Sequence, residues 1–182
     1  MAVGLRRGLQ LLAIAAVLAL LAVLIWRVVR DTEGGAAAAL RRGEHPVAPD
    51  FDLARVDGPG RVRLSSLRGK AVVVNLWASW CYPCIKESGV LEDGWRRWRD
   101  RGVAFVGVNA QDLGSDARRF LRRYGVSYPN VHDSSGGVLD AFGWTYFPET
   151  YFIRPGGRLE SAVLGQIDRE QLDAGIRGAL SP

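Results

Sequence analysis

An apolar run that leads straight into two cysteines and then into a helical pattern limits the possible folds more than any other feature. Residues 71–77 are apolar except for Asn75, as expected for a β-strand that is covered on both faces. Cys81 and Cys84, the two cysteines of the chain, follow with the spacing C-x-x-C. Residues 85–101 then show a helical pattern. This order predicts an α/β fold in which the cysteine pair lies at a strand-to-helix junction.

After residue 46 the chain alternates short β-like runs with helical patterns. Residues 103–109 predict a second buried strand, and Ser115 is expected to cap a helix that ends at Gly125. A loop and a short helix are expected at residues 133–143, and Asp168 should cap a last helix. Two hairpins are predicted from β-like runs that flank Gly- and Pro-rich turns: residues 51–56 with 61–64, and residues 150–154 with 158–165. These elements predict a central mixed β-sheet flanked by helices.

The first thirty residues predict a membrane anchor. From Leu9 to Trp26 every residue except Gln10 is apolar, and a helix of this length spans about 27 Å, close to the hydrocarbon thickness of a bilayer. The apolar core of a cleaved signal peptide is usually shorter, about 7 to 15 residues. The expected division is a short cytoplasmic segment, a transmembrane helix, a linker without core packing and an extracytoplasmic domain: residues 1–8, 9–29, 30–46 and 47–182.

The charge distribution argues against nucleic-acid binding. The chain carries a formal net charge of +5. Four arginines and no acidic residue lie in residues 1–30, so residues 31–182 hold 20 basic side chains against 19 acidic ones. A nearly neutral domain lacks the basic surface that binding to phosphates requires.

The C-x-x-C pair can carry out thiol-disulfide exchange. One thiolate attacks a disulfide, and the second sulfur resolves the mixed disulfide. Cys81 should attack first, because it lies where a helix N-terminus favours the anion, and Cys84 should be the shielded resolving residue. Glu87 lies one helical turn after Cys84 and could exchange a proton with it if the carboxylate is buried. The same spacing fits a surface glutamate equally well.

Other uses of the cysteines fit the sequence less well. Zinc sites usually have four ligands, whereas the chain offers this pair and two distant histidines, His45 and His132. Covalent haem attachment requires a histidine directly after the second cysteine, where Ile85 stands. A purely structural disulfide would close a very short loop and gain little stability from the unfolded state.

Two motifs resemble the thioredoxin superfamily. They are N-L-W-A-S-W-C-Y-P-C at residues 75–84 and F-P-E-T at residues 147–150. More narrowly, the chain is similar to the membrane-anchored thioredoxin-like proteins of cytochrome c biogenesis, the CcmG/DsbE, ResA and TlpA group. The resemblance covers about residues 47–180. It implies a thioredoxin-like fold with an N-terminal β-hairpin extension and a central insertion at residues 128–143.

The same resemblance implies roles for individual residues. Pro148 would be a cis-proline facing the cysteines, the backbone at Phe147 would pair with a substrate polypeptide, and Trp80 would border the same groove. Glu87 corresponds to the family's acidic residue after the cysteine motif, which favours a functional role. Thioredoxin itself carries a buried aspartate where Asn75 stands, so proton transfer by that route is not possible here. No cofactor is implied other than the redox-active cysteine pair.

The resulting expectation is an extracytoplasmic thiol-disulfide oxidoreductase. Its clients would be exported proteins with disulfides, such as apocytochrome c, and a membrane electron donor would restore its dithiol. A copper-delivery module on a similar fold is the alternative, because thiolates bind Cu(I), although that class generally uses a wider cysteine spacing and a nearby histidine. A peroxidase of the peroxiredoxin type is disfavoured, because the context of a lone peroxidatic cysteine is absent.

Overall fold

The computed structural model describes residues 2–33 and 35–181, and in the first helix it describes the side chains of residues 10–12 and 14–26. The chain forms two units, one up to residue 34 and one from Gly35 onward. The expected cytoplasmic segment, residues 1–8, lies outside the residues whose side chains are described.

The first unit is a single helix, α1 (Ala2–Glu33). Its described apolar side chains are exposed, among them Leu11, Leu18 and Ile25. In the part of the chain that the structure describes, no helix combines the length and the apolarity needed to cross a membrane. The residues of the expected anchor are helical, and the membrane crossing itself stays a prediction.

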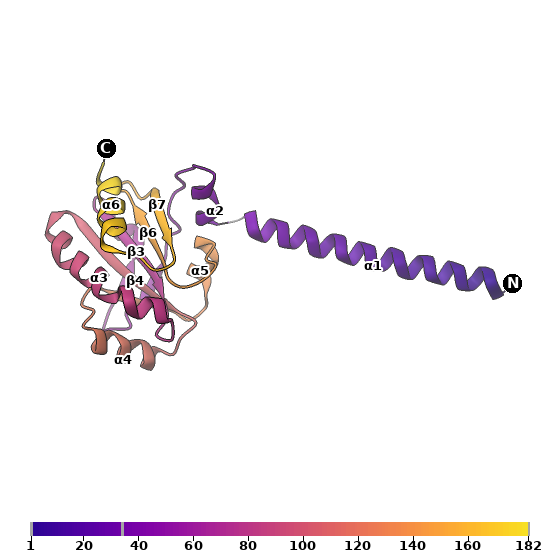
Figure 1. Ribbon diagram of the computed structural model, residues 1–182, viewed down its shortest axis with the longest axis horizontal. Helices are drawn as coiled ribbons and strands as arrows, with labels where there is room; N and C mark the ends of the chain where they lie inside the picture. The colour runs from indigo at the N-terminus through magenta and orange to yellow at the C-terminus, as the bar shows by residue number, and fades with distance from the viewer. Residues whose placement is uncertain (1, 34, 182) are drawn as a thin grey trace. The chain divides into compact units, whose positions relative to one another are not determined.

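The second unit is built on a five-stranded sheet with the order β5-β4-β3-β6-β7, of which Figure 1 labels β4, β3, β6 and β7. The central strand, β3, pairs parallel with β4 and antiparallel with β6. At the edges, β5 is parallel to β4, and β7 is antiparallel to β6. The strands span Ala71–Trp77 (β3), Val103–Ala110 (β4), Asn130–Asp133 (β5), Glu149–Ile153 (β6) and Leu159–Leu164 (β7). The predicted mixed sheet is therefore confirmed.

Helices cover both faces of this sheet. α3 and α6 lie side by side on one face (Figure 1), where Leu91 and Leu172 share a core cluster with Val73. On the other face Phe142 of α5 shares a second cluster with Val74. Because residues alternate along β3, its neighbouring valines reach opposite layers. The helices span Tyr82–Trp98 (α3), Gly114–Tyr124 (α4), Gly137–Phe142 (α5) and Arg169–Leu180 (α6), with short 3-10 helices at Leu64–Leu67 and Arg99–Arg101.

A two-stranded hairpin precedes the central sheet, as predicted. β1 (Asp52–Ala54) pairs antiparallel with β2 (Arg61–Arg63). The region expected to form a central insertion, residues 128–143, contains β5 and α5. Its short helix was expected, whereas β5 was not, because the sequence Asn-Val-His-Asp has no apolar run or alternation that would indicate a strand.

The predicted linker is wrong from Ala36 onward. Residues 36–41 form helix α2 (Ala36–Arg41), and its four alanines are buried. A Cβ at Gly35 would lie 2.6 Å from the Cα of Gly143, so the glycine permits close contact with the residue that ends α5. Alanines can pack closely without forming a stripe of large apolar side chains, which is why the composition did not reveal this packing. The folded unit therefore begins at Gly35, not at residue 47.

The helix ends agree with the sequence at two of three predicted positions. Leu113 is the N-cap of α4 and provides no side-chain hydrogen bond, so the cap predicted at Ser115 is wrong because Ser115 already lies inside the helix. Gly125 ends α4 in the left-handed conformation, with φ of 65°. Asp168 caps α6 by accepting from the backbone N–H of Gln171 in a reciprocal capping box.

Replacement of Ala37 by aspartate tests whether α2 belongs to the folded unit. Ala37 is 3% exposed, so Ala37→Asp should lower the free energy of unfolding by about 3 kcal/mol, because an unpaired charge is buried. For a domain of this size, that loss lowers the Tm by about 6 to 12 °C. Thermal unfolding of the full chain measures it. Arg41→Asp, at an exposed position of the same helix, is the control and should change the Tm by less than about 3 °C. Equal Tm values for all three proteins would show that α2 does not contribute.

Candidate active site

The cysteine pair lies where β3 leads into α3. Cys81 is the N-cap residue of α3, and Cys84 lies in its first turn. The two sulfurs form a disulfide. The backbone N–H of Cys84 donates to Cys81 Sγ at 3.2 Å. A thiolate at Cys81 would receive the same N–H at the positive end of the helix dipole, which favours the anion.

Both cysteines are shielded, whereas the residues beside them are exposed. Cys81 is 4% exposed and Cys84 is 2% exposed, compared with 61% for Trp80 and 65% for Tyr82. The predicted order of attack, Cys81 before Cys84, stays a prediction, because the disulfide form shields both sulfurs to a similar degree. The exposed aromatic rings give this end of the domain an apolar surface that a polypeptide could contact.

The Phe147-Pro148 peptide bond is cis, as the resemblance implied. The next residue, Glu149, pairs with Leu76 near the end of β3. Because β3 and β6 are antiparallel, the start of β6 lies at the same edge of the sheet as the end of β3, and the cysteines follow β3. The rings of Phe147 and Trp80 meet edge to face with their centroids 5.7 Å apart. The structure therefore brings the three predicted substrate-binding residues to the end of the sheet that carries the disulfide.

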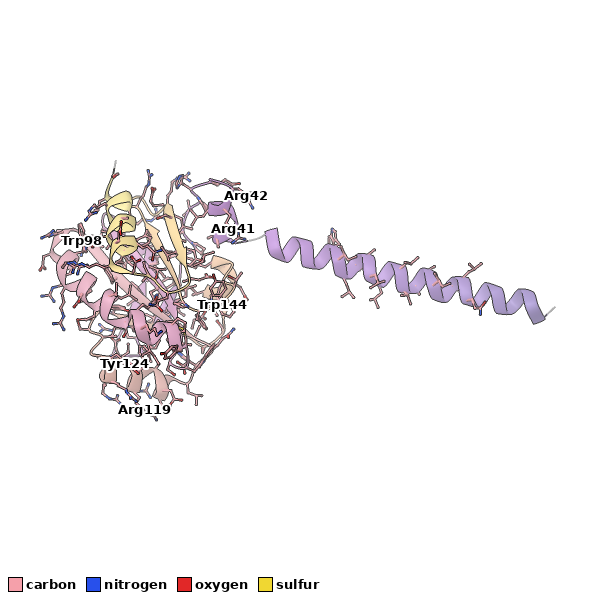
Figure 2. All side chains as sticks on the ribbon, viewed as in Figure 1. Arg41, Arg42, Trp98, Arg119, Tyr124 and Trp144 are labelled. Atoms are coloured by element: carbon pink, nitrogen blue, oxygen red, sulfur yellow. A yellow bond between two sulfur atoms is a disulfide. The ribbon has the colours of Figure 1, made fainter. Side chains whose placement is uncertain are left out.

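The aromatic contacts continue behind Phe147. Trp144, labelled in Figure 2 on the segment that leads from α5 toward β6, lies with its ring centroid 4.7 Å from that of Phe147. Phe147 is 8% exposed, so it is held between a half-buried and an exposed tryptophan. Its side chain is part of the core.

Glu87 is a buried carboxylate on α3. Its side chain is among the most completely buried in the domain, which decides between the two interpretations that its spacing allowed and excludes a surface glutamate. One oxygen accepts from Asn75 Nδ2 at 2.9 Å, and the other accepts from the backbone N–H of Ile167 at 2.9 Å. Burial raises the pKa of Glu87 from its ordinary value of 4.5 to about 7, against the opposing effect of these two hydrogen bonds. Its carboxyl group can therefore gain and lose a proton near neutral pH.

Sequence reasoning missed the part played by Glu149. This residue is fully buried directly after the cis-proline. It accepts from the backbone N–H of Thr145 at 3.1 Å, from Thr145 Oγ1 at 2.9 Å and from the hydroxyl of Tyr151 at 2.7 Å. These contacts tie the segment before the cis-proline to β6. The available signal was an acidic residue at the start of a strand that is otherwise apolar or neutral.

The cysteines remain the chemically distinctive group of this site. Among the described residues, no three or more His, Cys, Asp or Glu side chains gather as a metal site would require. His132 contacts Asn109 Oδ1 at 2.9 Å, and His45 contacts the carbonyl oxygen of Leu159 at 3.0 Å. Both histidines are thus engaged away from the cysteine pair.

Comparison with known proteins identifies the family. A profile of the AhpC/TSA family matches residues 46–162, more than half of the chain. The chain belongs to the AhpC/TSA family. The thiol-disulfide oxidoreductase ResA of Oceanobacillus iheyensis is 34% identical over 129 residues, which cover 69% of this chain and 67% of that protein. ResA of Bacillus subtilis strain 168 is 34% identical over 125 residues, which cover 69% of each chain.

Solved structures agree with this assignment. A thiol:disulfide interchange protein of the thioredoxin family from Chlorobium tepidum TLS superposes with a TM-score of 0.69 and 27% identity, and the match covers 76% of this chain and 98% of that one. The MTB dsbF structure gives a TM-score of 0.68 at 27% identity, with 74% and 98% covered. The AhpC/TSA member described here is therefore a thiol-disulfide oxidoreductase of the ResA/DsbE type with a thioredoxin-like fold, which confirms the resemblance found in the sequence.

The raised pKa of Glu87 predicts how stability depends on pH. The folded protein holds this proton more tightly than the unfolded chain, so the free energy of unfolding should fall as the pH rises from about 4.5 to about 7. The complete fall amounts to about 3 kcal/mol. Glu87→Gln removes it, so the variant should exceed the wild type by about 2 to 3 kcal/mol at pH 8 and match it at pH 4. Denaturant unfolding of the oxidised protein at several pH values measures this difference.

Glu92 on the same helix provides a control of opposite sign. Desolvation raises the pKa of Glu92, but hydrogen bonds from Ser127 and the ion pair with Arg96 outweigh it, and the net pKa is lowered. A carboxylate with a lowered pKa adds stability at neutral pH that is lost on acidification, so Glu92→Gln should be less stable than the wild type at pH 8. If the free energy of unfolding depended on pH in the same way in the wild type and in Glu87→Gln, Glu87 would not be the titrating group.

Proposed function

We propose that this thiol-disulfide oxidoreductase reduces disulfides in exported client polypeptides, apocytochrome c among them, while residues 9–29 hold it at the outer face of the cell membrane. The observation that carries the proposal is the arrangement at the end of β3. A cysteine pair caps a helix, a cis-proline stands at the neighbouring strand, and a carboxylate with a pKa of about 7 lies buried one turn along the same helix.

The first step is attack by the Cys81 thiolate on one sulfur of the client disulfide. A new bond forms between Cys81 Sγ and that sulfur, and the other client sulfur leaves as a thiolate. The Cys84 N–H that contacts Cys81 Sγ at 3.2 Å stabilises the attacking anion. The client backbone beside its cysteine would pair with the backbone at Phe147, next to the exposed ring of Trp80.

The second step releases the client. Cys84 loses its proton and attacks Cys81 Sγ, so that the Cys81–Cys84 disulfide forms and the second client sulfur leaves as a thiolate. The client disulfide has then gained the two electrons that the protein dithiol lost. Glu87 lies on the same face of α3 as Cys84, one turn further on, and its ionised form would accept the proton that Cys84 gives up. A membrane electron donor would return the disulfide to the dithiol.

A trapping experiment tests the choice of client. Cys84→Ser removes the resolving sulfur, so mixed disulfides between client and Cys81 should accumulate when the variant is produced in the exporting cell. Proteins of c-type cytochrome maturation should be recovered by non-reducing electrophoresis and mass spectrometry. The control, Cys81→Ser, retains one cysteine at the neighbouring position and should yield no such adducts.

Two other outcomes would contradict the proposal. Recovery of unrelated secreted proteins would indicate a general oxidase or isomerase. A protein that forms no adducts but binds one Cu(I) through both thiolates would favour the copper-delivery alternative.

The membrane anchor is proposed from the sequence of residues 9–26 and from the exposed apolar side chains along α1, which a bilayer would cover. Leu18→Asp together with Leu21→Asp should release the protein from washed membranes, because each aspartate costs about 2.5 to 3.5 kcal/mol at the centre of a spanning helix. Val47→Asp with Leu180→Asp places the same two changes at exposed positions of the second unit and should leave the protein membrane-bound. Equal fractionation of both double variants would exclude the anchor.

A further inference from the structure

A single carboxylate at the end of β4 binds the loop that precedes the cysteines. Asp112 accepts from the backbone N–H of Ser79 at 2.6 Å and from Ser79 Oγ at 2.9 Å. It also accepts from Asn109 Nδ2 and from the backbone N–H of Leu113, both at 2.8 Å. Hydrogen bonds to an ionised acceptor are about twice as strong as those between neutral groups. Both hydrogen-bond donors of Ser79, its backbone N–H and its hydroxyl, are therefore held by the Asp112 side chain.

Gln111, next to Asp112, contacts Trp80, the residue directly before Cys81. The indole N–H of Trp80 donates to the carbonyl oxygen of Gln111 at 2.9 Å. Gln111 has φ of 51°, the one positive φ at a residue other than glycine in the described part of the chain. A left-handed backbone is unfavourable for glutamine and persists only where the surroundings fix it. The segment after β4 thus takes up a strained conformation that contacts Ser79 and Trp80 together.

Asp112 is itself held from the sheet. Asn109, the donor to its Oδ2, is fully buried near the end of β4. The other end of the Asn109 amide, Oδ1, meets Nδ1 of His132 on β5 at 2.9 Å. Two neighbouring strands therefore fix the carboxylate in place before it contacts the loop that leads to Cys81. A carboxylate that is itself held in place can fix the position of the loop that it contacts, whereas a flexible surface aspartate cannot.

We propose that Asp112 is a positioning residue for thiol-disulfide exchange. It holds Ser79, and Gln111 beside it holds Trp80, so that the Cys81 sulfur stays at the tip of α3 in the direction from which it attacks. The proposal rests on the attacking role of Cys81 in the proposed function. The negative charge of Asp112, taken alone, would slow the attack by Cys81, because a nearby anion disfavours the Cys81 thiolate. Positioning and charge therefore predict opposite effects when Asp112 is replaced.

The test measures how fast the reduced protein attacks a disulfide. Purified full-length protein is reduced, the reductant is removed, and the second-order rate constant with glutathione disulfide is measured from pH 5 to pH 9. Asp112→Ala should lower this rate constant about tenfold across the whole pH range, because the sulfur is no longer held in its attacking geometry. Asp112→Asn keeps one acceptor oxygen and should show an intermediate loss. Ser79→Ala removes only the hydroxyl contact and should show the smallest loss.

Asp116 supplies the matched control. It lies on α4, four residues after Asp112, and pairs at 3.2 Å with Arg119, which Figure 2 labels on that helix. Asp116→Ala and Asp116→Asn remove the same charge from the same region without touching Ser79, so they should keep the wild-type rate constant. Exchange of the Trp80 indole proton, followed by NMR, gives a second readout. It should be faster in Asp112→Ala and unchanged in the Asp116 variants.

Several results would overturn the proposal. A rate constant for Asp112→Ala that equals the wild-type value, or exceeds it at acidic pH, would show that Asp112 acts through its charge or has no role. Equal decreases of the rate constant in Asp112→Asn and Asp112→Ala would also contradict it, because the acceptor oxygen that asparagine keeps would then make no difference. If Asp112→Ala does not fold, the graded pair Asp112→Asn and Ser79→Ala decides the question. A wild-type protein that does not react at all would overturn the proposed function as well, whereas an unaffected variant overturns this inference alone.

Discussion

β3 is paired on both sides, parallel to β4 and antiparallel to β6, and this pairing determines which parts of the chain meet at its carboxyl end. A parallel neighbour contributes its own carboxyl end to that edge, and an antiparallel neighbour contributes its amino end. The segment after β3 carries the cysteines, the segment after β4 carries Asp112, and the segment before β6 carries the cis-proline. Residues separated by tens of positions in the sequence therefore act at one place.

Glu87, Glu149 and Asp112 lie near the end of β3 and receive different sets of hydrogen bonds; Glu87 and Glu149 are buried, and Asp112 is partly buried. Glu87 receives two hydrogen bonds, and desolvation outweighs them, so its pKa is raised to about 7. Glu149 receives three hydrogen bonds and Asp112 receives four, and each ties a loop to a strand. The hydrogen bonds of Glu149 and Asp112 hold neighbouring segments together.

The sequence was sufficient wherever one element carries its own local signal. The bounds of β3, the two hairpins, the cap at Asp168 and the cysteine junction follow from apolar runs, turn residues and spacing. It was insufficient wherever the stabilising contacts come from distant residues. β5 is a strand because it pairs with the parallel edge of β4. The alanines of α2 are buried, although their composition resembles that of a linker. In the sequence Asp112 is indistinguishable from a loop aspartate, because its contact with Ser79 forms only in the fold. Burial of Glu87 had the same origin, because Asn75 and Ile167 lie on other elements.

Proton movement must accompany electron movement at Cys84, and the surroundings of that residue restrict how the proton can travel. Cys84 is 2% exposed in the disulfide form, so water has little direct access to its sulfur there. Asn75 cannot carry the proton, since an amide does not titrate in this range, but it donates to Glu87 at 2.9 Å and to Thr150 Oγ1 at 3.0 Å and thereby orients the carboxylate. On the Cys84 face of α3, Glu87 is a buried carboxyl group whose raised pKa of about 7 would suit the proposed proton transfer. A thiolate forming at Cys84 would raise that affinity further, because two anions in a poorly solvated region disfavour each other. In the proposed mechanism, release of the client and protonation of Glu87 would therefore be linked in the same step.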